Sequence, residues 1–582
     1  MFTLLKRVLR ALPAKVHSAP PVVSKRKGEM PDWARIIATN PGLWDESVRK
    51  SAQGPRVLMA TVVGGYPQFT LLESALSLAL TLRGVRVDTL ICDGALFGCL
   101  RAKIAGLSPE QLAAHDIGHV MCKGCQGSAR AVFDSTGLNQ VHLSSLLSAQ
   151  DEESARHLAQ TVPVDQIDSY VLDGIPVGEH SMAGALRYFG VGDIAGQRCA
   201  EGVLRAYFES GLRTAYAMRN LLDQTAYDAI VTNHGIYTPH GIINAVARRR
   251  NIHTVAWNLA YRKQCAIFSH NDTYHHTLME EPVGLWDAMD WSPAHEADIM
   301  AYLDSRRGGK NDWIWFNRDG DSDMDGFSRD SGIDWSRPVI GMLTNVVWDA
   351  QLHYPANAFE NMLDWVMQTV DYFAARPDLQ LLIRVHPGEL APPGGQTVSR
   401  QPVAEAIHSH FGGTLPKNIF IIRPESKVST YAAMDRCNAV IIYGTKTGVE
   451  LTAQGSPVIV AGEAWIRNKG LTLDATDADS YFRILDGLPF AERLDAGTMG
   501  RARKYAYHFF FRRMVPVPFL DSTPEAWPPY RIAVDTLDEL LPGVSPGLDI
   551  LCDGILDEAR PFVYPAEILG RHDLQQSEAV AS

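Results

Sequence analysis

Three things are missing from this 582-residue chain, and each argues against a class of function. It contains no uninterrupted run of about 18 apolar residues, so no helix is expected to span a membrane. It has no excess of positive charge, because 54 Lys and Arg stand against 66 Asp and Glu. The resulting net charge of −12 argues against nucleic acid as the principal partner. The pair Gly64-Gly65 is not part of a GxGxxG fingerprint, which leaves a dinucleotide-binding site with little support.

Cysteine is also scarce, with eight residues in the chain. Four of them are scattered, as expected of a cytosolic protein without disulfides. The other four lie closer together in the sequence and include one C-x-x-C pair: Cys92, Cys99, Cys122 and Cys125. Thiolates spaced in this way suit tetrahedral zinc, and an iron–sulfur cluster less well. Two hypotheses therefore stand, a structural zinc site or four reduced and buried thiols without a metal.

The first 27 residues differ in kind from the rest. The segment MFTLLKRVLRALPAKVHSAPPVVSKRK carries apolar residues at helical spacing beside basic ones, and the first acidic residue is Glu29. A secretory signal would need a longer uninterrupted apolar stretch. The pattern fits a basic amphipathic helix lying on an anionic membrane surface, or a solvated tail. We therefore expect a cytoplasmic protein, which on the first interpretation also contacts the inner membrane peripherally.

The chain is too long for one hydrophobic core, so two domains with extensions are expected. Changes in composition place the boundaries as follows: a basic amphipathic tail at 1–30, a first Rossmann-like domain containing the cysteine cluster at 31–305, an acidic glycine-rich linker at 306–336, a second Rossmann-like domain at 337–500, and a C-terminal extension at 501–582.

The first domain opens with a clear βαβ pattern. A strand is expected at Val57–Val63, then the Gly64-Gly65 turn, a helix from about Thr70 to Arg83, and a strand at Val87–Cys92. A second α/β stretch, YDAIVTNHGIYTPHG, places His234 just past the end of a strand. Polar residues at such positions are candidates for chemistry.

The segment from Leu381 to Thr472 is the most informative part of the chain. Its apolar runs are short, rich in Val and Ile, and followed by Gly, Pro, Thr or Ser. That pattern is typical of parallel strands that feed loops at the carboxyl edge of a sheet, where ligands of open α/β sheets bind. The imidazole of His386 and a helix start with two Thr hydroxyls provide donors for a phosphate. The residues expected to bind it are Asn345, Asp349, Arg384, His386, Pro387, Thr445, Thr447, Gly448, Glu450 and Thr472.

The motifs TNVVWDA, RVHPGE, YGTKTGVELTAQGSPVIVAG and KGLTLD resemble those of bacterial capsule polysaccharide biosynthesis proteins, the group that contains Kdo-transferase-like enzymes. The resemblance covers about a quarter of the chain, between Pro338 and Leu485. It implies a GT-B-like α/β fold with two Rossmann-like domains facing across a cleft. The His386-Pro387 pair and the Thr445/Thr447 turn resemble the motifs with which transferases of CMP-sugars hold cytidine and phosphate.

The resemblance implies a glycosyltransferase of GT-B type that moves a sugar from a nucleotide-activated donor, held by the second domain. The acceptor, a surface or capsular polysaccharide or a glycolipid, would bind the first domain. An inverting reaction needs a base for the acceptor hydroxyl, and His234 is the first candidate, followed by Asp93 and His240. Two alternatives stand: a polyol-phosphate transferase of the teichoic-acid type with a CDP-linked donor, and a non-catalytic scaffold of a capsule assembly complex.

Overall fold

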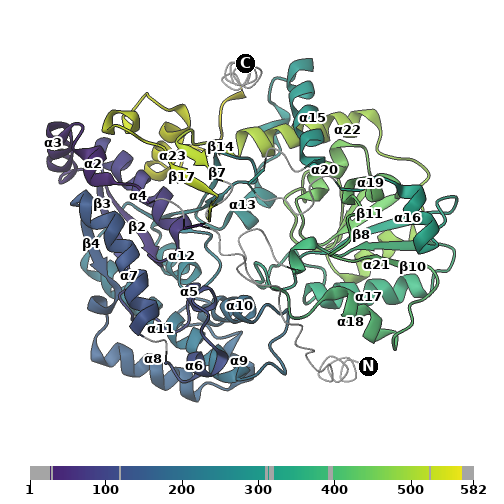
Figure 1. The fold of residues 1–582 in the computed structure, drawn as a ribbon, viewed down its shortest axis with the longest axis horizontal. Coiled ribbons are helices and arrows are strands. Elements are labelled where there is room, and N and C mark those ends of the chain that lie inside the picture. The colour runs from purple at the N-terminus through teal and green to yellow at the C-terminus, as the bar shows by residue number, and fades with distance from the viewer. Residues whose placement is uncertain are drawn as a thin grey trace. The chain divides into compact units, whose positions relative to one another are not determined.

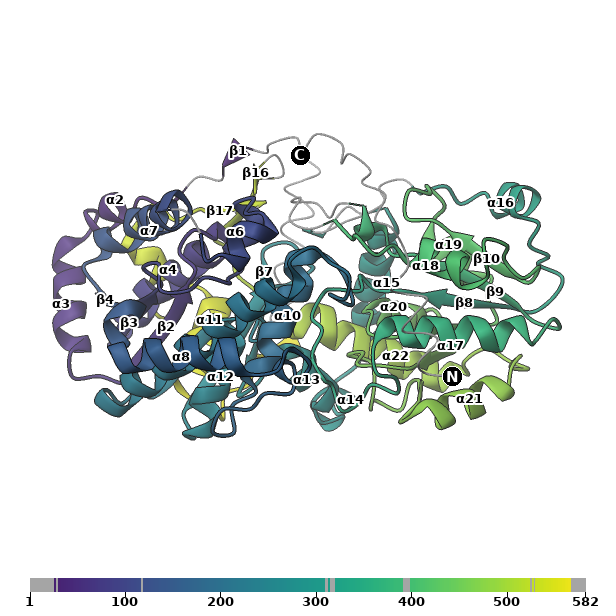
Figure 2. The ribbon, with the colours of Figure 1, turned by 90° about the horizontal axis from the view of Figure 1, so that it is seen from below.

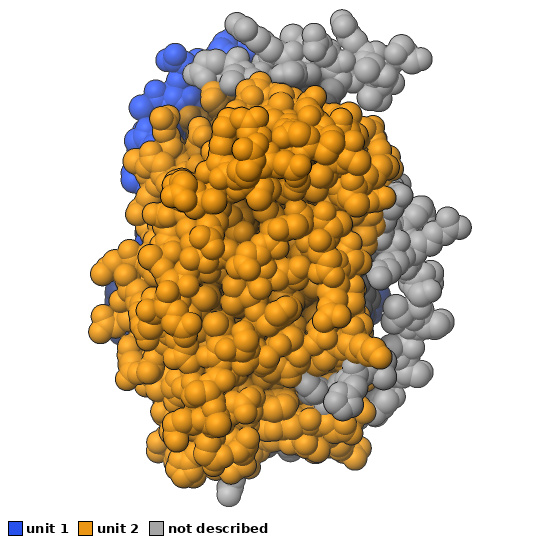
Figure 3. All heavy atoms as spheres, turned by 90° about the vertical axis from the view of Figure 1, so that its left-hand side faces the viewer, with its two compact units in different colours: residues 1–22, 189–196, 275–509 blue, residues 23–188, 197–274, 510–582 orange. Residues whose placement is uncertain are grey.

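The computed structural model describes residues 26–27, 30–116, 119–308, 312–313, 320–390, 398–523, 526–527 and 529–566. These residues form two compact units (Figure 3). Unit 1 takes in the described parts of 189–196 and 275–509, and unit 2 those of 23–188, 197–274 and 510–582. The change of unit therefore falls within helix α13 (Tyr274–Glu280) rather than at the expected linker 306–336. Most of the expected C-terminal extension belongs to unit 2.

Unit 2 is built on a seven-stranded sheet in the order β14-β7-β6-β5-β2-β3-β4 (Figure 1). The neighbouring strands β6, β5, β2, β3 and β4 are parallel to one another. Strands β7 and β14 are antiparallel to their neighbours. The parallel strands follow the order of a Rossmann sheet, in which the first strand, β2, lies beside the fourth, β5. The strand bounds are β2 (Arg56–Val62), β3 (Arg86–Ile91), β4 (Asn139–His142), β5 (Ala229–Asn233), β6 (His253–Leu259), β7 (Cys265–His270) and β14 (Val515–Pro516).

The helices of unit 2 pack around this sheet. Their bounds are α2 (Trp33–Ile37), α3 (Pro41–Ser51), α4 (Pro67–Leu82), α5 (Arg101–Ile104), α6 (Pro109–Ala113), α7 (His119–Phe133), α8 (Ala149–Thr161), α9 (Val164–Ile167), α10 (Val177–Phe189), α11 (Ala200–Gln224), α12 (His240–Arg249) and α23 (Pro546–Leu556).

The expected βαβ unit at the start of this sheet is confirmed as β2, α4 and β3. Helix α4 begins three residues before the expected Thr70, at Pro67, because proline suits the first turn of a helix. Every residue from Phe69 to Thr81 is buried. The helix thus has almost no face exposed to solvent, because α3, α23 and the strand β17 (Tyr530–Ile532) all pack against it.

Unit 1 contains a six-stranded parallel sheet in the order β10-β9-β8-β11-β12-β13. This again is the Rossmann order, with the first strand β8 beside the fourth, β11. The strands are β8 (Val339–Leu343), β9 (Gln380–Arg384), β10 (Ile419–Ile422), β11 (Ala439–Ile442), β12 (Val458–Val460) and β13 (Leu473–Asp474). The helices are α14 (Gly284–Asp287), α15 (Pro293–Arg307), α16 (Met324–Ser331), α17 (Met362–Ala374), α18 (Val403–His410), α19 (Thr430–Asp435), α20 (Thr447–Ala453), α21 (Ala478–Asp486) and α22 (Ala496–Tyr507).

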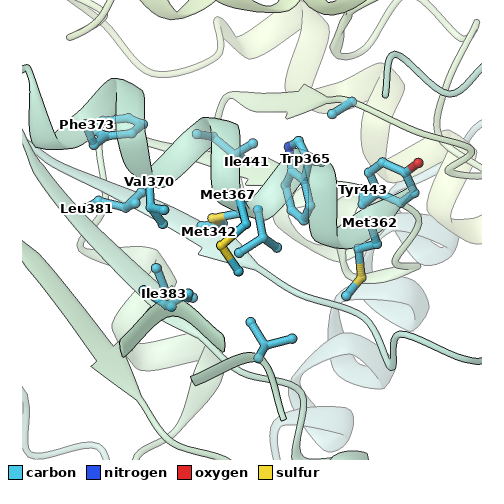
Figure 4. Close-up of a cluster of buried hydrophobic side chains, with 14 of the residues drawn as sticks. Met342, Met362, Trp365, Met367, Val370, Phe373, Leu381, Ile383, Ile441 and Tyr443 are labelled. Carbon is cyan, nitrogen blue, oxygen red and sulfur yellow. The ribbon is translucent and has the colours of Figure 1, made fainter. Parts of the chain in front are cut away.

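The core of unit 1 forms where α17 packs on the sheet (Figures 2 and 4). Trp365, Val370 and Phe373 repeat at helical spacing on α17 and are fully buried. They pack into one cluster with strand residues such as Met342 and Ile441. This core fixes the strands of the sheet, and with them the loops at their carboxyl ends.

The expectation of a GT-B-like α/β fold built on two Rossmann-like units is confirmed. The segment expected to lie on a membrane surface is residues 1–27, and residues 1–25 of it lie outside the described residues. Among the helices that the structure describes, none is both long enough and apolar enough to cross a bilayer.

Candidate functional site

At the carboxyl edge of the unit 1 sheet, polar side chains connect the loops that follow neighbouring strands. The switch point of this sheet lies between β8 and β11. Thr344, directly after β8, accepts a hydrogen bond from the backbone N–H of His386 at 3.1 Å. The side-chain oxygen of Asn345 accepts one from the N–H of Gly444 at 3.3 Å, on the other side of the switch point. In open α/β sheets ligands bind outside the strand ends at this point, and Asn345 and His386 both lie at this edge.

The imidazole of His386 is half-buried and neutral. Burial, together with the positive charges of Lys446 and Arg384, lowers the pKa of His386 to about 4. The N–H of Gly388 donates to Nδ1 at 3.0 Å, so the proton of the neutral ring sits on Nε2. The turn after Pro387 therefore sets the tautomer, and His386 offers an N–H donor from Nε2 near the charge of Lys446.

The turn after β11 brings two hydroxyls and one ammonium group together. Thr445 Oγ1 accepts from the N–H of Thr447 at 3.3 Å and donates to Thr447 Oγ1 at 3.2 Å. Lys446 lies between them, and all three residues are half-buried. Glycine is required on either side: a Cβ on Gly444 would be 2.8 Å from the Glu463 carbonyl oxygen, and one on Gly448 2.6 Å from Ile442.

A buried cluster of charged side chains fixes the position of Lys446 in this turn. Lys446 Nζ donates to Glu450 at 3.1 Å, and Arg306 donates to the same carboxylate at 3.0 Å. The hydroxyl of Tyr431 donates to its other oxygen at 2.6 Å, and Arg306 also pairs with Asp312. Burial alone would raise the pKa of Glu450, but Arg306 and Lys446 bring it down to about 2. Glu450 thus acts as the buried counter-ion that positions Lys446, and it is not exposed to bind a ligand.

Two more of the expected binding residues are engaged elsewhere. Arg384 is 2% exposed and donates to the Thr430 hydroxyl and to two backbone carbonyls of the loop that precedes α19, at 2.6–3.3 Å. Its guanidinium thus stabilises that loop. The Thr472 hydroxyl donates to Asp474 at 2.6 Å within its own turn. Asp349 is exposed. Its negative charge raises the pKa of His386, so Asp349 lies near the imidazole.

Sequence reasoning missed the cations that give this edge its charge. Lys446 stands inside the YGTKTG motif, where its position between two threonines was the available signal. Arg306 had no local signal, because its carboxylate partner Glu450 is 144 residues away. The pair His276 and Glu463, 3.5 Å apart near the end of β12, was also missed.

The switch point of unit 2 lies between β2 and β5 and carries His234. His234 follows β5 with φ of 61°, and its N–H donates to the Trp257 carbonyl at 2.8 Å. At the end of β2, Val62 has φ of 48°. A β-branched residue in the left-handed region is strained, and such strain clusters at functional sites.

The ring of His234 ends a chain of hydrogen-bonded polar groups. Gln68 donates to Asn258 at 3.3 Å, and Asn258 donates to the Tyr274 hydroxyl at 3.0 Å. That hydroxyl lies 3.4 Å from His234 Nε2. The rings of Tyr237 and Tyr274 also flank the imidazole, with centroids 5.4 and 5.6 Å away. The chain orients a half-buried His234 at the sheet edge.

The two other candidates for the base have different surroundings. His240 is 1% exposed, and its Nε2 lies 3.2 Å from the Thr61 carbonyl. Burial lowers the pKa of His240 to about 4. Asp93 accepts from both the N–H and the hydroxyl of Ser144, and thereby fixes the loop after β4. These contacts favour structural roles for His240 and Asp93 and leave His234 as the accessible candidate.

No protein-family model and no curated protein sequence matches the chain. Among solved structures, the β-Kdo 2,4 transferase KpsC of Thermosulfurimonas dismutans aligns over 54% of this chain and 87% of its own, with 13% identity and a TM-score of 0.32. The β-Kdo 2,7 transferase KpsC of the same organism covers 50% and 79%, with 10% identity and a TM-score of 0.29. Sucrose-phosphate synthase of Thermosynechococcus elongatus covers 78% and 95%, with 10% identity and a TM-score of 0.23. TM-scores of this size do not establish a shared arrangement of the whole chain.

Proposed function

We propose that the chain is a glycosyltransferase that uses a nucleotide-activated sugar, with a CMP-sugar as the favoured donor, and glycosylates a surface or capsular glycan or a glycolipid. The observation that carries the proposal is the edge of the unit 1 sheet. There the Nε2 donor of His386, the ammonium of Lys446 and the hydroxyls of Thr445 and Thr447 surround the Rossmann switch point. Such a set of donors suits a phosphate group.

The same residues would assist the departure of the donor nucleotide. When the bond from the anomeric carbon to the phosphate breaks, negative charge develops on the phosphate oxygen. A neutral imidazole that donates from Nε2 and a half-buried lysine held by Glu450 can stabilise that charge without rearranging. Donors fixed in this way contribute more in the transition state than in the bound substrate.

In unit 2, His234 is our candidate for the base that takes the proton of the acceptor hydroxyl. The support is its place at the second switch point, beside the strained Val62 and at the end of the Gln68–Asn258–Tyr274 chain. The two tyrosine rings beside it are buried, at 3% and 6% exposure, and they pack against the imidazole. Tyr274 orients the imidazole, as the partner of a general base must.

Calorimetry of the full chain with CMP, UDP and GDP tests the donor half of the proposal. We expect one of the three, with CMP favoured, to bind in the micromolar to millimolar range typical of substrates. The same nucleotide should lose affinity for a Lys446→Met variant and keep it for an Arg423→Met variant, since Arg423 pairs with the exposed Glu405. Binding of none of the three would contradict the assignment and favour a scaffold.

We further propose that residues 1–27 attach the protein peripherally to an anionic membrane. Deletion of these residues should abolish sedimentation with anionic liposomes and leave the turnover of a water-soluble acceptor unchanged. Equal sedimentation of the full-length and shortened chains would contradict this role.

A further inference from the structure

Three separate segments of unit 2 bring four cysteines to the carboxyl edge of its sheet. Cys92 directly follows β3, Cys99 precedes α5, and Cys122 and Cys125 lie on α7. The last two are three residues apart in a helix, so they share one face of α7. All four are free thiols, and none of them takes part in the phosphate or acceptor sites described above.

Helix α7 packs unusually close to the turn after β2. A Cβ on Gly64 would lie 2.4 Å from the side chain of Ala129, and one on Gly65 2.9 Å from the Cα of Cys125. Only glycine fits at these positions, which explains the Gly64-Gly65 pair without a nucleotide. The close approach lets the N–H of Gly65 donate to Cys125 Sγ at 2.9 Å.

The segments that carry the cysteines lie against one another. A Cβ on Gly94, two residues after Cys92, would be 3.9 Å from the Cβ of Cys122, and one on Gly65 would be 3.1 Å from Cys125 Sγ. Cys99 lies two residues before Arg101, whose side chain donates to the Gly65 carbonyl at 2.9 Å. The four cysteines therefore converge from three segments on one part of the sheet edge.

Backbone N–H donors surround the sulfurs. Besides the Gly65 amide, the backbone N–H groups of Gly94 and Leu96 hydrogen-bond to the Cys92 sulfur, and that of Arg101 to the Cys99 sulfur. N–H donors to sulfur of this kind are the outer contacts that stabilise metal-bound thiolates.

We propose that Cys92, Cys99, Cys122 and Cys125 hold a metal centre with four thiolate ligands. Among the residues that the structure describes, no three Cys, His, Asp or Glu side chains are arranged to hold a single metal ion. Zinc draws its four sulfurs to about 2.3 Å from one point, so the thiols would have to move inward to bind it. An iron–sulfur cluster bonds each cysteine to an iron atom of the cluster and accepts a wider spacing. The four-thiolate set suits a zinc ion or an iron–sulfur cluster, and elemental analysis distinguishes the two.

The centre would act on the switch point of unit 2 through the backbone. It would connect α7 and the start of α5 to the ends of β2 and β3, which are neighbouring strands. All four ligands come from the protein, so a zinc ion here would have no open position and would be structural. Loss of the metal should loosen the Gly64-Gly65 turn beside Val62, without removing a group that touches the donor.

The test is elemental analysis of the full chain, purified anaerobically without added metal. We expect iron and acid-labile sulfide in similar amounts, about four of each per chain for a cubane cluster, or about one zinc if a single ion is bound. Cys125→Ser should lose the metal, and the control Cys199→Ser should keep it, because Cys199 is exposed and far from the cluster in the sequence. A wild-type protein with neither zinc nor iron would overturn the proposal.

A second measurement does not depend on the folding of a variant. In wild-type protein, the four cluster thiols should resist alkylation until a chelator or an oxidant removes the metal, and the modified positions can then be read by mass spectrometry. Equal alkylation of these four thiols before and after that treatment would contradict a metal centre. Nucleotide affinity should be the same with and without the metal, which separates this proposal from the proposed transferase function.

Discussion

The two Rossmann sheets of this chain differ most at their switch points. Between β8 and β11 of unit 1 the edge carries donors and positive charge, with Lys446 held by the buried carboxylate of Glu450. Between β2 and β5 of unit 2 the edge carries His234, two tyrosine rings and a chain of neutral hydrogen-bonding groups, and the cysteines lie beside it. The same strand order thus supports two kinds of chemistry, because the residues after each strand, rather than the strands, define the site.

The difference agrees with a division of labour in which unit 1 binds an anion and unit 2 a neutral, hydroxyl-rich molecule. A phosphate needs fixed positive charge, which must itself be neutralised where it is buried. A sugar hydroxyl needs a base and neutral hydrogen-bonding partners. Each of the following predictions changes one side of this comparison.

The largest effect is expected from Arg306→Met. Arg306 is buried between Asp312 and Glu450, so its removal leaves Asp312 without its ion-pair partner and Glu450 with Lys446 alone. Breaking a buried ion pair in this way typically costs about 3–5 kcal/mol. Urea unfolding should therefore show a much lower midpoint. The neighbouring Arg307→Met is the matched control, because Arg307 pairs with the half-buried Asp435 and should cost about 1 kcal/mol or less. Similar losses in both variants would contradict the role of the cluster.

His386→Ala should lower the rate of sugar transfer by about a hundredfold to a thousandfold, the usual effect of losing one donor to a developing charge. The fold should survive, because the imidazole is half-buried at a loop. Initial rates with a saturating donor measure the effect, and circular dichroism checks the fold. His410→Ala is the control, since His410 lies on α18 of the same unit and pairs with Asp371. A His386→Ala variant with more than half of the wild-type rate would rule out the assignment.

His234→Asn tests the other side of the comparison. Asparagine tolerates the positive φ of this position but cannot act as a base. Transfer should fall by about a hundredfold or more, and the affinity for the donor nucleotide should stay at the wild-type value. A parallel loss of nucleotide affinity would place His234 in donor binding instead.

The sequence predicts much of this fold, because strands and the turns after them leave local patterns. The βαβ unit from Arg56 to Ile91 and the strand ends at Asn345, His386 and His234 all appear where their patterns indicate. The hydrogen-bond and ion-pair partners of a side chain are harder to predict, because they depend on residues far apart in the chain. Arg384 looked like a phosphate ligand from its place beside the HP motif, yet its guanidinium faces the loop before α19.

The domain boundaries were also beyond local patterns. The expected linker at 306–336 contains Arg306, which lies in the buried core of unit 1. The expected C-terminal extension returns to unit 2, where Val515 pairs with Ala266 in the main sheet. Such returns join segments about 250 residues apart and leave no signal in either segment alone.

A smaller effect is expected from the double variant Thr445→Val, Thr447→Val. Valine keeps the shape of threonine and removes the hydroxyl, so the donor nucleotide should bind about tenfold more weakly. The double serine variant restores both hydroxyls and is the matched control, expected to bind like the wild type. Calorimetry measures both. Equal affinity for the valine and serine variants would show that backbone N–H groups alone hold the phosphate.

The last prediction concerns pH and Glu389, a buried carboxyl two residues after Pro387. One oxygen accepts from the Val403 N–H at 3.2 Å, and the other is buried without a hydrogen-bond partner among the described residues. Burial raises the pKa of Glu389 from 4.5 to about 8. Between these two values the unfolded chain releases this proton and the folded chain keeps it. The carboxyl therefore contributes stability below about pH 4.5 that is lost as the pH rises toward 8.

Glu389→Gln removes this titration and keeps the acceptor oxygen for Val403. We expect the melting temperature of the variant to exceed that of the wild type increasingly from pH 5 to pH 8, and the gap to close on acidification. Glu405→Gln is the control, because Glu405 is exposed and pairs with Arg423. Glu73 is the counterpart in unit 2, where burial raises its pKa to about 7 although Trp257 donates to it. Glu73→Gln should show a smaller gap, which stops growing about one pH unit earlier. Curves that stay parallel to the wild type for both variants would mean that the two carboxyls are ionised in the folded protein.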